Sequence, residues 1–171
     1  MENMFRRQIV IVGCGRVGAV LAESFDAVGH QVIIVDINGR AFDRLSSSFR
    51  GAAIRGDGTD EDTLRRAGAE DADVFLAFTE GDNRNVMASQ IAAETLGAKR
   101  VIAKINDPVR AAAYGELGIA TICRTTMLSD AVHEYLGLAA SGMPSVIAPS
   151  GSHHVDVQHR EPAAGTAPVE G

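Results

Sequence analysis

Short apolar runs alternate with longer amphipathic segments over the first 138 residues of the chain. The runs are continuous and rich in β-branched side chains, which is typical of strands buried on both faces of a parallel sheet. They cover residues 9–12, 32–35, 52–55, 74–79, 101–105 and 119–123. This alternation predicts an α/β fold, a Rossmann-like doubly wound parallel sheet of six strands in the order 3-2-1-4-5-6, with helices on both faces.

The segments between the runs carry helix signals at their ends. Thr59, followed three residues later by Asp62, resembles a capping box for a helix over 60–67. Asp107 and Pro108 suit the N-cap and the first position of a helix that ends near Gly118. Further helices are expected over 82–96 and 125–138, and the last has an apolar stripe of Leu128, Val132, Tyr135 and Leu136.

A glycine-rich turn joins the first apolar run to the first amphipathic segment. It has the form G-x-G-x-x-G, with Gly13, Gly15 and Gly18 as its glycines. The three glycines allow a tight turn, close backbone approach to a pyrophosphate and close packing of the helix on the sheet. Asp36 ends the second run 18 residues after Gly18, near the spacing at which a carboxylate meets a ribose diol. The unit therefore predicts an adenine-nucleotide site.

The carboxyl ends of the strands, around the switch between strands 1 and 4, select the candidate binding residues. They are Gly13, Cys14, Gly15, Arg16, Val17, Gly18, Asp36, Ile37, Asp57, Gly58, Thr79 and Lys104.

Two of these candidates are basic. Arg16 stands where a guanidinium can reach a terminal phosphate, the alternative being a solvated surface arginine. Lys104 is a charge on a buried strand, the alternative being a structural ion pair. No arginine adjoins Asp36, which disfavours NADP, although Arg40 is close.

Composition limits the partners and the compartment. The net charge of −6 and the isoelectric point near 5.3 exclude a surface that binds nucleic acid by neutralising phosphates. No apolar stretch reaches the ~20 residues of a membrane span, and the first residues lack a signal-peptide core, so we expect a cytoplasmic protein. Two cysteines without metal spacing fit a reducing compartment, although Cys14 could act as a redox sensor.

The composition changes after residue 138. Residues 139–171 are rich in Gly, Ser, Pro, Ala and His, and we expect them to form a mostly disordered tail behind a nucleotide-binding domain over 7–138. His153, His154, Asp156 and His159 are a weak candidate for a transition-metal site, and no metal is expected.

Catalytic signals are lacking. Neither tyrosine has a lysine four residues later, and no G-x-S-x-G, H-E-x-x-H or Walker lysine is present. No catalytic residue is expected.

Over residues 7–138 the chain resembles the N-lobe of RCK domains, the TrkA N-terminal domain of Trk and Ktr potassium-transport regulators. The resemblance rests on the segments IVGCGRVG, VIIVD, GDGTDEDTLRRAG, FTEGDNRNVMAS and AKINDP. It implies that the turn and Arg16 hold phosphates, Asp36 the ribose and the Asp57 segment the adenosine, while Lys104 reaches toward phosphate. Asn85 also matches a family position. The implied ligands are ATP, ADP or NAD(H).

The resemblance further implies assembly into dimers or higher rings and a partner that is an integral-membrane potassium channel or transporter, with this subunit at the inner face of the membrane. Two departures qualify it. Arg124, Thr125 and Thr126 stand where relatives often carry proline and a metal-binding acid, so no metal is expected there. The usual C-terminal RCK lobe is not expected either.

Three functions remain open at this stage. The leading one is a regulatory subunit that gates potassium transport through a nucleotide-dependent change in its oligomer. The others are a small NAD-dependent oxidoreductase or redox sensor completed by a partner chain, and an interaction scaffold that binds no nucleotide.

Overall fold

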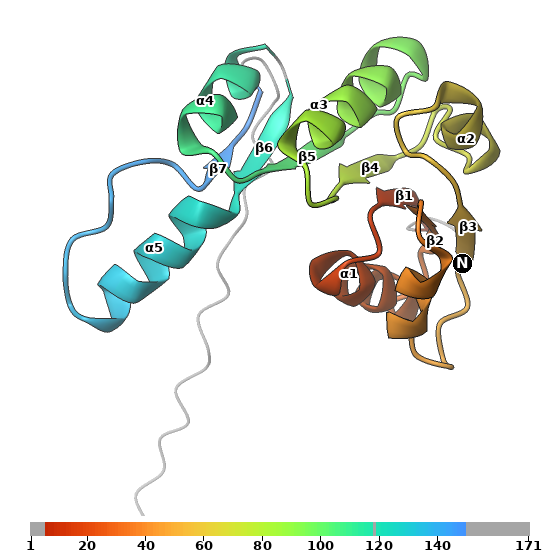
Figure 1. The fold of residues 1–171 in the computed structure, drawn as a ribbon, viewed down its shortest axis with the longest axis horizontal. Coiled ribbons are helices and arrows are strands. Elements are labelled where there is room, and N and C mark those ends of the chain that lie inside the picture. The colour runs from red at the N-terminus through yellow and green to blue at the C-terminus, as the bar shows by residue number, and fades with distance from the viewer. Residues whose placement is uncertain (1–5, 118, 150–171) are drawn as a thin grey trace, which may run out of the picture.

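A seven-stranded sheet in the order β3-β2-β1-β4-β5-β6-β7 forms the framework of the molecule (Figure 1). The structure, a computed structural model, describes residues 6–117 and 119–149. The first six strands are parallel and follow the predicted order 3-2-1-4-5-6. Their bounds are β1 Gln8–Val12, β2 Gln31–Asp36, β3 Ala52–Arg55, β4 Val74–Ala77, β5 Val101–Ile105 and β6 Ala120–Cys123. The doubly wound α/β prediction is confirmed.

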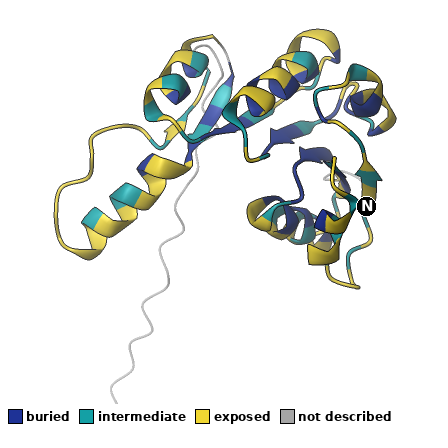
Figure 2. Cartoon of the chain, viewed as in Figure 1, coloured by how far each residue is buried: buried dark blue, intermediate teal, exposed yellow. Residues whose placement is uncertain are grey.

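Helices cover both faces of this sheet. Ala22 of α1 and Ala41 of the 3-10 helix η1 pack on one face, while Leu64 of α2 and Ala88 of α3 pack on the other. The last helix, α5, runs away from the sheet and is mostly exposed (Figures 1 and 2). The helices are α1 Arg16–Ala27, η1 Gly39–Arg44, α2 Glu61–Arg66, α3 Asp82–Gln90 with its π-helical continuation η2 Ile91–Thr95, α4 Pro108–Glu116 and α5 Arg124–Tyr135.

The two central strands are buried on both faces, as their continuous apolar runs predict. In β1, Ile9 and Ile11 pack against the α1 side, whereas Val10 and Val12 pack against the α2 and α3 side. Burial of both faces fixes the register of these strands, because a shift by one residue would exchange the two sets of side chains. The carboxyl ends of β1 and β2 are thereby held side by side.

The structure differs from the sequence prediction in a seventh strand. β7 (Val146–Ile147) pairs antiparallel with β6, and the Cys123 N–H donates to the Ser145 carbonyl at 2.8 Å. Ile147 packs beside Gly115, where an added Cβ would lie 2.2 Å from the Ile147 Cγ2. The strand falls within 139–171, where we expected a mostly disordered tail. Two residues carry no detectable periodicity, and pairing covers an otherwise open strand edge. The histidines at 153, 154 and 159 lie outside the described residues.

The N-cap of α2 is Asp60 rather than the predicted Thr59. The Asp60 Oδ2 accepts from the Thr63 N–H at 2.9 Å and from its hydroxyl at 2.7 Å. The N–H and the hydroxyl of Thr59 instead donate to Asp57, so the Thr59 side chain is not available to cap the helix. At α4 the prediction is confirmed, with Asp107 as the cap and Pro108 in the first turn.

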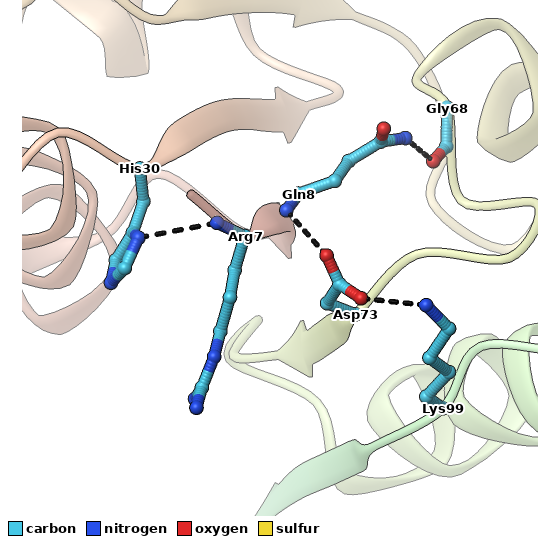
Figure 3. Close-up of polar contacts among 6 residues, drawn as sticks. All are labelled: Arg7, Gln8, His30, Gly68, Asp73 and Lys99. Atoms are coloured by element: carbon cyan, nitrogen blue, oxygen red, sulfur yellow. Dashed lines mark hydrogen bonds and ion pairs between the residues drawn. The ribbon is translucent and has the colours of Figure 1, made fainter. Parts of the chain in front are cut away.

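A polar cluster ties the amino end of β1 to the loops that precede its neighbours (Figure 3). The Gln8 N–H donates to the Asp73 Oδ2 at 2.9 Å, and the Lys99 Nζ lies 2.7 Å from the Asp73 Oδ1. The Gln8 side chain donates to the Gly68 carbonyl. This end of the sheet is closed by contacts within the chain. Nowhere in residues 6–117 and 119–149 is a helix both long and apolar enough to cross a membrane.

Candidate functional site

A cleft of about 260 Å³ lies at the carboxyl ends of β1, β2, β3 and β4, opposite the closed end of the sheet. Eight of the twelve predicted residues line it, namely Gly13, Cys14, Gly15, Asp36, Ile37, Asp57, Gly58 and Thr79. The lining also includes Val12, Val35, Asn38, Ala41, Arg44, Gly56, Thr59, Phe78, Glu80 and Arg84. The structure therefore places a hollow where the strand order changes direction, which is where ligands bind in open α/β sheets.

The glycine turn at the end of β1 leaves no room for side chains at two of its positions. Gly13 has φ +105°, and its N–H donates to the Val35 carbonyl at 2.7 Å. A Cβ on Gly18 would lie 1.9 Å from the Gly13 carbonyl oxygen, because α1 packs directly on the turn. At Gly15, by contrast, the nearest atom to an added Cβ is the Glu80 Oε1 at 3.8 Å. The turn is thus tight at both ends and open at its middle.

The first turn of α1 offers unpaired donors beside this opening. Gly15 is the N-cap, so no side chain caps the helix, and the first turn contains no acidic residue. The N–H groups of Gly15, Arg16 and Val17 find no acceptor in the part of the chain that the structure describes. Free N–H groups and the positive end of the helix dipole make such a terminus a site for an anionic group.

Asp36 brings a fixed carboxylate to the opposite wall of the cleft. Its Oδ2 accepts from the Cys14 N–H and its Oδ1 from the Asn38 N–H, both at 2.8 Å. Each oxygen retains a lone pair toward the cleft, so the carboxylate can accept further from hydroxyl groups. In dinucleotide-binding folds a helix start receives the phosphates and a carboxylate at the end of the second strand receives the ribose, and Gly15 and Asp36 bring these two features to one cleft.

The loop after β3 closes the third side. A Cβ on Gly58 would lie 2.1 Å from the Val12 Cγ1, so only glycine lets this loop pack on the end of β1. The Asp57 Oδ1 accepts from both the N–H and the hydroxyl of Thr59, which lowers the pKa of the Asp57 carboxyl. Asp57 therefore stays ionised, with its other oxygen available to a ligand.

Asn85 fixes the segment after β4, which forms the fourth side of the cleft, from within the core. Its side chain is fully buried, and its Oδ1 accepts from the N–H and the hydroxyl of Thr79, both at 2.7 Å. Its amide donates to the carbonyls of Thr79, at 3.1 Å, and Lys104, at 2.7 Å. One side chain thus joins the ends of β4 and β5. These contacts are a structural reason for an asparagine at position 85, which matches a position of the family.

Four predicted residues lie outside the lining of the cleft. Arg16 and Val17 are exposed at the start of α1, next to Gly15, which does line the cleft. Gly18 is buried and acts through packing. Lys104 is only 5% exposed, and burial lowers the pKa of its ammonium, opposed by the charge of Glu80. It has no ion pair within residues 6–117 and 119–149, so the structural-pair alternative lacks a partner there.

Sequence reasoning missed Glu80 and Arg84, which follow strand β4 in the segment FTEGDNRN. A charged residue directly after a strand at the switch point is the signal that could have selected them. The environment of Cys14 does not favour the redox role that the sequence leaves open for it. Burial, followed by the charge of Asp36, raises the pKa of its thiol, and its Sγ lies 3.3 Å from the Ala41 carbonyl. A thiol held in its protonated form is a poor nucleophile.

Comparisons with known proteins show the family to which the chain belongs. The family model described as TrkA-N domain matches residues 9–125. The Trk system potassium uptake protein TrkA of Streptomyces coelicolor is 46% identical over 122 residues, which are 71% of this chain and 55% of that protein. The chain spans about half the length of three curated relatives that it matches, with shares of 55%, 48% and 44%, and less than a quarter of three longer ones.

Two solved structures share the fold. The Kef C-terminal domain of Shewanella denitrificans, in an AMP-bound form, has a TM-score of 0.61 at 23% identity and covers 77% of this chain and 82% of its own. The GsuK channel bound to NAD has a TM-score of 0.62 at 19% identity over 80% of this chain and 24% of its own. The match to the TrkA-N family model, over residues 9–125, spans the six parallel strands from Ile9 onward and includes the glycine turn and Asp36. The chain belongs to the TrkA-N domain family, the N-lobe of RCK domains.

Proposed function

We propose that this chain is a regulatory subunit of a potassium-transport system and binds an adenine nucleotide in the cleft between β1, β2 and β3. One observation carries the proposal: Gly15, the N-cap of α1 with an unpaired N–H, and Asp36, whose carboxylate is held by two backbone N–H groups, line the same hollow. A phosphate and an adenosine ribose fill these two positions together. The named relatives are potassium uptake proteins, which supports the transport context.

The two nucleotide-bound structures support the choice of ligand. AMP and NAD, the molecules named for the Kef domain and the GsuK channel, have adenosine monophosphate in common. ATP and ADP contain the same group. NADP fits less well, because the Asp36 carboxylate would face its 2′-phosphate, although Arg44, unlike Arg40, is among the residues that line the cleft.

Regulation would act through the oligomer. A nucleotide shifts an equilibrium only when it binds one arrangement more tightly than the other. The exposed side chains of Leu128, Val132, Tyr135 and Leu136 on α5 form an apolar stripe without a partner element in the described part of the chain (Figure 2). Burial of this stripe in a homodimer or larger ring would connect the cleft to an integral-membrane channel or transporter at the cytoplasmic face.

Titration calorimetry with AMP, ADP, ATP, NAD and NADH tests the ligand. We expect saturable binding to the wild type, weakened roughly 10- to 150-fold in Asp36→Ala by loss of a charged hydrogen bond worth ~1.5 to 3 kcal/mol. Asp43→Ala removes the same charge from an exposed position of η1 outside the cleft and should bind as the wild type does. Absence of nucleotide binding, or equal affinity in Asp36→Ala, would overturn the proposal. Steady NADH consumption with a carbonyl substrate would favour the oxidoreductase alternative.

A further inference from the structure

Glu80 lies where the phosphates of a bound nucleotide would arrive. It follows β4, it lines the cleft, and its Oε1 is 3.8 Å from the position of an added Cβ on Gly15. Gly15 is the residue whose open side faces the anion site. A carboxylate thus stands at the entrance to a helix terminus that otherwise attracts negative charge.

The charge of Glu80 is not neutralised by a direct contact. Its carboxylate makes no hydrogen bond and no ion pair within 4 Å among the residues that the structure describes, and its side chain is exposed. The other two acids of the cleft differ in this respect, since Asp36 and Asp57 accept hydrogen bonds from neighbouring N–H groups. Glu80 therefore has no hydrogen-bond or ion-pair partner that a ligand would have to displace, and within the chain its charge acts on the buried Lys104 only through space.

A carboxylate in this place would interact differently with each of the possible ligands. AMP would bring a single phosphate to the turn, whereas ATP would bring two further phosphate groups toward Glu80, and like charges repel. NAD keeps the diphosphate and carries a second ribose in place of the third phosphate of ATP, and the hydroxyls of that ribose can donate hydrogen bonds to a carboxylate. The same residue can thus oppose one ligand and favour another.

We propose that Glu80 is a specificity-determining residue that selects an adenine dinucleotide over a free nucleoside triphosphate. The inference rests on the proposed nucleotide site and names its preferred ligand class. Selection of this kind combines an attractive contact to the chosen ligand with a repulsive element against its competitor.

Glu80→Gln tests this inference, because it removes the charge and keeps the size of a side chain that makes no hydrogen bond or ion pair within the described fold. Affinities for AMP, ADP, ATP and NAD are measured by calorimetry at low ionic strength with EDTA. We expect ATP to bind roughly 3- to 10-fold more tightly and NAD several-fold more weakly, with AMP nearly unchanged. Glu70→Gln makes the same charge change at an exposed residue outside the cleft and should leave all four affinities as they are.

Two kinds of result overturn the inference. An unchanged ratio of the ATP and NAD affinities in Glu80→Gln, or an equal change for all four ligands, removes Glu80 as the selecting residue while the nucleotide site itself stands. Failure of the wild type to bind any of the four ligands removes both the site and the selection.

Discussion

Gly18→Val perturbs the contact on which the phosphate turn depends. The Cβ of any side chain at this position would lie 1.9 Å from the Gly13 carbonyl oxygen, a backbone atom that cannot rotate away. The start of α1 must therefore move off the turn, and the N–H groups of Gly15 and Arg16 move with it. The substitution should lower the stability of the free protein and abolish nucleotide-dependent stabilisation.

The size of the lost effect follows from linkage. A ligand at ~100 times its dissociation constant stabilises a protein by ~2.7 kcal/mol if it binds only the folded state. Thermal unfolding with and without saturating AMP or NAD measures this shift. We expect the full shift in the wild type and none in Gly18→Val.

Two further variants separate folding from binding. Gly15→Ala adds a Cβ in open space, 3.8 Å from the Glu80 Oε1, so it should leave the free protein stable but reduce the ligand-induced shift. Gly39→Ala is the control, because its Cβ would make an ordinary 3.6 Å contact with the Arg55 Cδ outside the cleft. The placement of the phosphate site is refuted if Gly18→Val and Gly15→Ala both keep the full shift.

Three other substitutions test separate parts of the account. Asn85→Leu should lower the free energy of unfolding in urea by ~2 to 4 kcal/mol because buried partners lose their hydrogen bonds, whereas exposed Asn83→Ala should change it by less than about 1 kcal/mol. Burial lowers the pKa of Lys104 in the folded protein, so between that pKa and about 10.5 the unfolded chain binds more protons than the folded one. The free energy of unfolding of the wild type should therefore rise with pH across this window. Lys104→Met should flatten the rise and be more stable than the wild type at neutral pH. Leu128→Glu should shift light scattering toward monomer, and a wild type already monomeric at tens of micromolar would contradict the proposed oligomer.

The sequence was sufficient for the parts of the fold that local pattern determines. Continuous β-branched runs specified β1 and β2, and the spacing from the glycine turn to Asp36 specified two walls of the cleft. The two residues of β7 carry no pattern, and their pairing depends on the open edge of β6. Glu80 was missed because its position relative to Gly15 arises from the packing of separate segments, 65 residues apart.

The most direct test of the central claim is a nitrogen–proton correlation spectrum of the labelled protein titrated with AMP. The account predicts that the amide signals of Gly15, Arg16 and Val17 shift most, together with those around Asp36, in proportion to saturation. Signals at the opposite end of the sheet, such as that of Gln8 in the cluster of Figure 3, should stay in place. Shifts centred on that opposite end, or no saturable shift at the start of α1, would contradict the account.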